Sequence, residues 1–76
     1  MPPTPSDTVT AAVTYWLARR GMSIREGARQ ANREYAWLQR RTSGSVPWSV
    51  DDVAHMAGVL RVPTDALYNH VTQLSA

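Results

Sequence analysis

Apolar residues recur along this chain at the spacing of α-helices, and no segment shows the polar and apolar alternation of a half-buried β-strand. The clearest apolar stripe begins at Val9 and continues to Leu17, at positions i, i+3, i+4, i+7 and i+8. The 76 residues include no cysteine, so the chain is expected to form one small domain without disulfide bonds. The sequence therefore predicts an all-α fold of about five helices.

The N-terminus is rich in proline, which lacks the amide hydrogen that a helix interior needs. We expect residues 1–7 to be a flexible leader and residues 8–76 to form the domain. The first helix is expected to begin near Thr8 and to end at Gly21.

The middle of the chain predicts two short helices joined by a tight turn. Ser23 and Glu26 have the spacing of a capping box, in which each side chain bonds the other residue's backbone amide, so a helix is expected to begin at Ile24. That helix is expected to end just before Asn32, because asparagine accepts the left-handed conformation that closes a helix. The next helix is expected over residues 34–42.

Two further helices are expected after a loop at residues 45–48. Ser49 caps the first of them, and Pro63 stops it. Its buried stripe is expected to be Val53, Met56, Ala57 and Leu60. Thr64 is expected to cap the last helix, whose apolar residues fit either the core or a homodimer surface. These residues are Leu67, Val71 and Leu74.

Positive charge is concentrated in the middle of the chain. Residues 19–41 hold seven of the eight arginines and two acidic residues, hence a net charge of +5. The remainder holds one arginine and four aspartates, hence a net charge of −3. This segregation favours a surface that faces a polyanion, and an ordinary solvated helix face is the alternative. All the basic residues are arginines, and arginine suits bidentate contacts to phosphate or guanine.

Residues 23–44, SIREGARQANREYAWLQRRTSG, have a small residue in a first helix, a left-handed residue at a turn, an apolar residue in a second helix and Ser-Gly after it. These places are filled by Ala28, Asn32, Leu38, Ser43 and Gly44. The segment resembles the helix-turn-helix of the Cro and lambda-repressor-type (XRE-like) DNA-binding family, and residues 50–67 resemble the segment that follows it in that family.

The resemblance implies a compact five-helix, lambda-repressor-like domain that binds double-stranded DNA sequence-specifically. It implies a transcriptional regulator, expected to be a repressor of phage or bacterial origin, that inserts helix 34–42 into the major groove. Because a single domain of this size buries little DNA surface, a homodimer on two half-sites is expected.

Some residues depart from the family pattern. Gly27 replaces a usual leucine, Asn32 replaces glycine, and Arg33 and Arg41 replace apolar residues. The apolar face over residues 24–31 is therefore small. We expect Trp16 and Trp37 to supply the missing volume from neighbouring helices.

The outward face of helix 34–42 is expected to read base edges. At about 100° per residue, turning Leu38 inward places Ala36, Gln39 and Arg40 outward. Gln39 can bond adenine, Arg40 can bond guanine or a phosphate, and Ala36 can contact a thymine methyl group. In the family, residues at the start of this helix also meet base edges. The resemblance therefore implies a base-reading set of Glu34, Tyr35, Ala36, Gln39 and Arg40. The family's phosphate contacts correspond to Ser23, Arg25, Arg33, Ser43 and Ser45.

Two residues of this region are open to a structural role. Glu34 is favoured as a structural residue rather than a reader of cytosine. Arg41 turns half inward, where it can pair with an acidic side chain. The acids in reach are Glu34, Asp51 and Asp52.

Other chemistry finds little support in the sequence. His55 and His70 do not make a zinc site, and no nucleophile and base arrangement appears, so we expect no enzymatic activity, metal, cofactor or small-molecule ligand. Apolar runs are too short for a membrane span, and a soluble cytoplasmic protein is expected.

The alternative function is a protein-interaction module, an antitoxin or adaptor that binds through Trp48, Tyr68 and the last helix. Nonspecific binding to anionic membrane or RNA is a further alternative.

Overall fold

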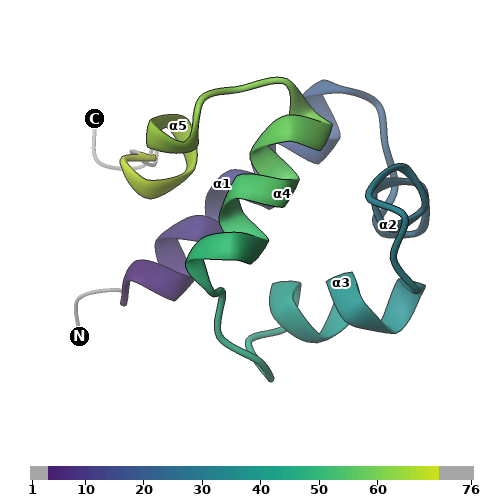
Figure 1. Cartoon of the computed structure of the whole chain (residues 1–76), viewed down its shortest axis with the longest axis horizontal. Coiled ribbons are helices and arrows are strands. Elements are labelled where there is room, and N and C mark those ends of the chain that lie inside the picture. Colours follow the sequence, from purple (N-terminus) through teal and green to yellow (C-terminus); the bar gives the residue numbers. More distant parts are fainter. Residues whose placement is uncertain (1–3, 71–76) are drawn as a thin grey trace.

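The computed structural model describes residues 4–70, which form five α-helices and no strand (Figure 1). The helices are α1 (Pro5–Arg19), α2 (Ile24–Gln30), α3 (Tyr35–Thr42), α4 (Val50–Leu60) and α5 (Thr64–Tyr68). The predicted all-α, five-helix fold is confirmed. Within the described range, every helix is too short or too polar to cross a membrane.

The helices α1 and α4 pack against each other through the middle of the molecule, and α5 packs on both of them at one end (Figure 1). At the other end lie α2 and α3, which contact each other, while α3 also contacts α1. In this view α2 is seen end-on and α3 runs across the picture, so the two helices cross steeply. The helices α2 and α3 therefore lie against α1 and α4, and one side of α3 faces away from them.

The core consists of apolar side chains contributed by all five helices and the turn after α2. The α4 stripe is buried as predicted, and Leu38 is the residue that α3 contributes. Leu67 also lies in the core, which removes it from the expected dimer surface, whereas Val71 and Leu74 lie outside the described residues. The buried apolar residues are Val9, Ala12, Val13, Leu17, Ala28, Ala31, Leu38, Val53, Met56, Ala57, Leu60 and Leu67.

Helix α1 begins earlier than expected. The Thr4 hydroxyl accepts a hydrogen bond from the Asp7 amide, and the Asp7 carboxylate accepts one from the Thr4 amide, both at 3.1 Å. Pro5 occupies the first helical position, where its missing amide hydrogen would have no partner in any case. The expected start near Thr8 was therefore wrong, and residues 4–7 belong to the helical fold rather than to a leader.

The predicted capping box of α2 is only half formed. The Ser23 hydroxyl accepts from the Glu26 amide at 3.0 Å, but the Glu26 carboxylate does not return to Ser23. It accepts instead from Arg29 and Gln30, further along the same helix. Helix α2 still begins at Ile24 as predicted, because the serine cap alone satisfies one of its first amides.

Two other predicted helix starts differ by one residue. Helix α3 begins at Tyr35, and Glu34 precedes it as an N-cap whose side chain makes no capping bond. Helix α5 begins at Thr64, and its N-cap is Pro63, so the expectation that Thr64 caps this helix was wrong. By contrast, Ser49 caps α4 as predicted and forms a full capping box with Asp52.

Gly27 lets α2 approach its neighbours closely. A Cβ atom at this position would lie 2.6 Å from Leu17 Cδ2 and 3.2 Å from Leu38 Cδ2. The volume that the usual leucine would fill is therefore taken by two leucines of α1 and α3. Trp16 and Trp37, which were expected to supply this volume, are partly buried and pack against the core.

Candidate nucleic-acid interface

The backbone at both ends of α3 is fixed by residues with positive φ. Asn32 has φ 58° in the turn before α3, as predicted, and Gly44 has φ 89° after it. Around Asn32, the Arg33 amide donates to the Ala28 carbonyl at 2.9 Å and closes the end of α2. The turn therefore sets where α3 starts relative to α2, and the glycine lets the chain leave α3 sharply.

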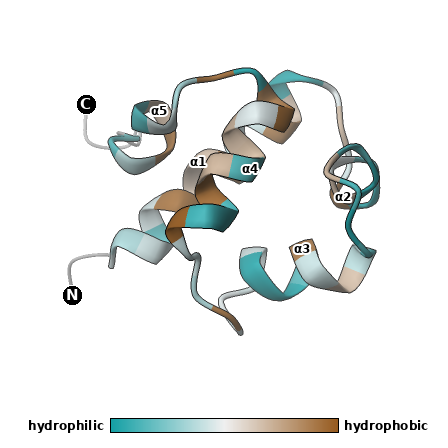
Figure 2. Ribbon diagram, in the orientation of Figure 1, coloured by the Kyte–Doolittle hydropathy of each residue, from teal (hydrophilic) through white to brown (hydrophobic). Residues whose placement is uncertain are grey.

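Helix α3 has a buried side and an exposed side. Leu38 is fully buried, while Gln39 and Arg40 are exposed and Ala36 is partly exposed. At the start of the helix, Glu34 and Tyr35 are also exposed. The five expected base-reading residues are thus accessible. In Figure 2 the ribbon of α3 is hydrophilic toward its C-terminal end and paler toward its start.

The five expected phosphate-binding residues are exposed as well. Arg25 lies beside the first residue of α3, and Arg33 lies in the turn. After α3, the Ser43 and Ser45 hydroxyls lie 3.1 Å apart. The Ser23 hydroxyl caps α2 but keeps its own hydrogen for a further acceptor. The Ser43 hydroxyl donates to the Arg40 carbonyl at 3.0 Å, whereas Arg25 and Arg33 keep donors that no acidic side chain among residues 4–70 occupies.

Few of the arginines in this region are neutralised by acidic side chains. Within residues 4–70 the ion pairs are Arg29 with Glu26 at 2.6 Å and Arg41 with Asp52 at 2.9 Å. Hydrogen bonds from Arg29 and Gln30 lower the pKa of the Glu26 carboxyl, which stays ionised and occupied by its own helix. The arginines that surround α3 without an acidic partner in this range are Arg25, Arg33 and Arg40.

Arg41 is a structural residue, and of the three acids in reach it selects Asp52. Its Nε atom donates to Asp52 Oδ2 at 2.9 Å, and its Nη1 atom donates to the Trp37 carbonyl at 2.9 Å. Partial burial raises the pKa of Asp52, but hydrogen bonds from Arg41 and Ser49 outweigh it and leave the pKa below its usual value. The C-terminal half of α3 is therefore tied to the first turn of α4.

Trp48 does not face a partner as the alternative function expected. Its indole nitrogen donates to Thr10 Oγ1 at 2.9 Å, and its backbone amide donates to Ser6 Oγ at 3.0 Å. Its ring also meets Trp37 edge-on, with centroids 6.2 Å apart. Trp48 therefore joins α1 to the segment after α3, and the interaction-module alternative loses one of its anchors.

His55 has a structural contact rather than a place in a metal site. Its Nε2 atom lies 2.6 Å from the Ala31 carbonyl oxygen, which only accepts, so Nε2 carries the donated hydrogen. This bond links α4 to the end of α2. Among residues 4–70, no three histidine, aspartate or glutamate side chains gather into a group that could hold a metal ion.

Sequence reasoning missed the contacts between arginines and aromatic rings around α3. The Arg25 guanidinium lies 4.7 Å from the ring centre of Tyr35, and the Arg33 guanidinium lies 5.5 Å from that of Trp37. Both distances fall within the range of about 6 Å for attraction between a cation and an aromatic ring. The contact of Arg25 with Tyr35 joins two helices, so no spacing within one helix could have indicated it.

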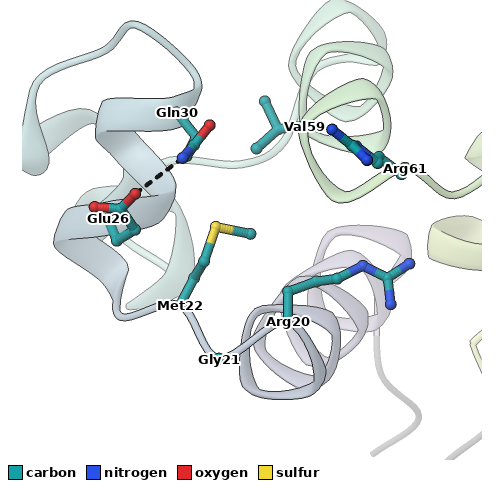
Figure 3. A pocket seen from close by; sticks show the side chains of 7 residues that line it. All are labelled: Arg20, Gly21, Met22, Glu26, Gln30, Val59 and Arg61. Carbon is teal, nitrogen blue, oxygen red and sulfur yellow. Dashed lines mark hydrogen bonds between the residues drawn. The ribbon is translucent and has the colours of Figure 1, made fainter.

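A hollow of about 680 Å³ lies between α2 and the C-terminal ends of α1 and α4 (Figure 3). Met22 and Val59 project into it, and the hydrogen-bonded pair of Glu26 and Gln30 lies along one side. The Arg20 side chain turns away from that pair and donates from Nε to the Leu60 carbonyl at 3.0 Å. Of the polar side chains that line this hollow, Glu26, Gln30 and Arg20 make hydrogen bonds within the protein.

Comparison with known proteins supports the fold. No protein-family model matches the chain, and no curated protein matches it. The chain is similar to a solved structure, the clp gene regulator ClgR from C. glutamicum, with a TM-score of 0.76 and 19% sequence identity. The match covers 95% of this chain and 100% of that chain. The protein thus shares the all-helical fold of that gene regulator, and within this fold α2 and α3 are two short helices joined by a tight turn.

Proposed function

We propose that this protein binds double-stranded DNA sequence-specifically and regulates transcription. The observation that carries the proposal is that α3 exposes Gln39 and Arg40 while Leu38, on its other side, is fully buried. The fold shared with a gene regulator adds support. The finer assignment, a cytoplasmic repressor of phage or bacterial origin, rests on the resemblance of residues 23–44 to the Cro and lambda-repressor-type family.

In the proposed complex α3 enters the major groove. Its eight residues make a rod about 12 Å long, comparable to the width of the groove. Gln39 and Arg40 can then bond adenine and guanine edges, and Ala36 can meet a thymine methyl group. Glu34 and Tyr35 complete the proposed base-reading set at the start of the helix. The proposed phosphate contacts are Ser23, Arg25, Arg33, Ser43 and Ser45.

A homodimer belongs to the same proposal. One domain with a single short reading helix contacts only a few base pairs, so useful affinity requires two copies on half-sites about 34 Å apart. Under this proposal the preferred DNA sequence is a palindrome.

The test is to select bound duplexes from a random pool at about 150 mM salt and then to measure variants on the selected site. Gln39→Ala and Arg40→Ala are each expected to weaken binding by about 1–3 kcal/mol and to relax one base position. Arg19→Ala is the matched control, because it removes an exposed arginine from the last turn of α1. It is expected to leave the base preference unchanged. Unchanged affinity and preference in both α3 variants, or no enriched sequence, contradicts the proposal.

A further inference from the structure

We infer that Tyr35 and Trp37 are positioning residues that hold Arg25 and Arg33 against phosphates on opposite strands of the groove. The inference rests on the proposed function, because it assumes that α3 lies in the major groove of a duplex. It concerns how the phosphate backbone of the DNA is bound, and it adds two aromatic residues to those that contribute to this binding.

Each contact crosses from one element of the helix-turn-helix to the other. Arg25 belongs to α2, and its guanidinium lies 4.7 Å from the ring centre of Tyr35. Arg33 belongs to the turn, and its guanidinium lies 5.5 Å from the ring centre of Trp37. Neither arginine has an acidic partner among residues 4–70, so each ring holds a charge that is still available to an anion.

The two rings lie on opposite flanks of α3. Tyr35 and Trp37 are two positions apart, which is about 200° around a helix. Ala36 lies between them, about 100° from each, on the side away from the buried Leu38. A helix in the major groove has one phosphate backbone along each of its flanks, since the groove is only about 12 Å wide. One arginine therefore faces each strand.

The Trp37 ring is itself held in place from the protein side. The Arg41 guanidinium lies 4.4 Å from its centre and is fixed by its ion pair with Asp52. Trp48 and His55 meet the ring edge-on, with centroids 6.2 and 6.3 Å away. A hollow of about 410 Å³ opens beside this ring, and it is where a phosphate would enter. It is lined by Asn32, Arg33, Glu34, Trp37 and Arg40.

Holding an arginine before binding strengthens its contact with a phosphate. A free arginine side chain loses much of its rotamer freedom when it binds, about 2 kcal/mol at most. A ring that already restricts the guanidinium removes part of that cost. An exposed interaction of this kind corresponds to about a two- to five-fold change in affinity.

The first experiment is a double-mutant cycle on the selected duplex. Tyr35→Leu is expected to weaken binding about two- to five-fold more in the wild-type background than in the Arg25→Ala background, where only its base contact is lost. Tyr35→Phe, which keeps the ring, is expected to keep the coupling to Arg25. Tyr15→Leu is the matched control, because it removes the same kind of contact outside α2 and α3. The Arg19 guanidinium lies 5.9 Å from the centre of the Tyr15 ring, which also contacts the ring of His70, after α5. Equal losses from Tyr35→Leu in both backgrounds overturn the positioning role.

The second experiment maps the strands with duplexes that carry one neutral methylphosphonate at a time. Arg25→Ala and Arg33→Ala are each expected to lower the slope of log affinity against log salt by about 0.9. Each variant is also expected to become insensitive to one methylphosphonate, and the two positions are expected on opposite strands of one half-site. Positions on the same strand overturn the inference while leaving specific binding intact. Absence of specific binding by the wild type contradicts the proposed function itself.

Trp37 needs a variant that keeps the fold, because the ring also packs against the core. Trp37→Phe retains an aromatic face, and Arg33→Lys retains the charge but loses the planar group that stacks on the ring. Both variants are expected to bind DNA about two- to five-fold more weakly than the wild type. The melting temperature of Arg33→Lys is expected to be unchanged. Full affinity in Arg33→Lys contradicts a role for the Trp37 ring.

Discussion

Replacing Gly27 with alanine tests the close approach of α2 to its neighbours. An alanine in the middle of a helix is favoured over glycine by about 1 kcal/mol. Here the added Cβ would lie 2.6 Å from Leu17 Cδ2 and 3.2 Å from Leu38 Cδ2, both on buried side chains. Such overpacking costs about 1–3 kcal/mol. The crowding outweighs the gain in helix propensity, so Gly27→Ala is expected to be destabilising by about 1 kcal/mol.

The same change is expected to reverse sign when the crowding atoms are removed. Leu17→Val deletes both δ carbons, which account for the contacts at 2.6 and 3.8 Å. In that background Gly27→Ala is expected to stabilise by up to about 1 kcal/mol, so the two sites couple by about 1–2 kcal/mol. Gly58→Ala is the control, because a Cβ at Gly58 in α4 meets no atom within 4 Å. It is expected to stabilise by about 1 kcal/mol.

Thermal unfolding followed by far-ultraviolet circular dichroism measures these differences. In a domain of this size 1 kcal/mol shifts the melting temperature by about 4–8 °C. Gly27→Ala is therefore expected to melt below the wild type, and Gly58→Ala above it. If both glycine variants melt higher by similar amounts, the helices do not meet closely at Gly27 and the reasoning from its contacts is refuted.

Two further predictions concern single residues. Arg61 ends α4 in the left-handed region with φ 60°, which favours glycine, so Arg61→Gly is expected to raise the free energy of unfolding by about 0.5–1 kcal/mol in urea titrations. Asp52→Asn is expected to cost about 1–3 kcal/mol at pH 7, because it breaks the ion pair with Arg41. Since the folded-state pKa of Asp52 is lowered, its stabilisation is present above the unfolded pKa and is lost as the pH falls through the folded value. The difference between variant and wild type should therefore shrink below about pH 4, and a constant difference contradicts it.

The positions of the helices could be predicted because their apolar stripes and caps are local signals. The buried stripe of α4 from Val53 to Leu60 can be predicted from the periodicity of that segment alone. Asn32 indicates the turn because asparagine accepts a positive φ. The start of α1 was missed because Thr4 and Asp7 lie in a proline-rich segment, although their spacing is that of a capping box. The end of α4 at Arg61 carried no signal, since arginine has no preference for positive φ.

The candidate site was predictable around one helix but not between helices. A helical wheel centred on Leu38 suffices to place Gln39 and Arg40 outward, and the structure leaves both exposed. The partner of Arg41 could only be narrowed to three acids, because the loop between α3 and α4 decides that Asp52 comes nearest.

The contact of Arg25 with Tyr35 depends on the packing of α2 against α3, and that packing depends on a residue outside the site. Gly27 lies two positions after Arg25 and lets α2 settle directly on Leu17 and Leu38. A leucine at that position would fill this space and move α2 outward, taking the guanidinium away from the ring. The departure from the family pattern at Gly27 and the arginine stack at Tyr35 are therefore parts of one arrangement, which no single segment of the sequence contains.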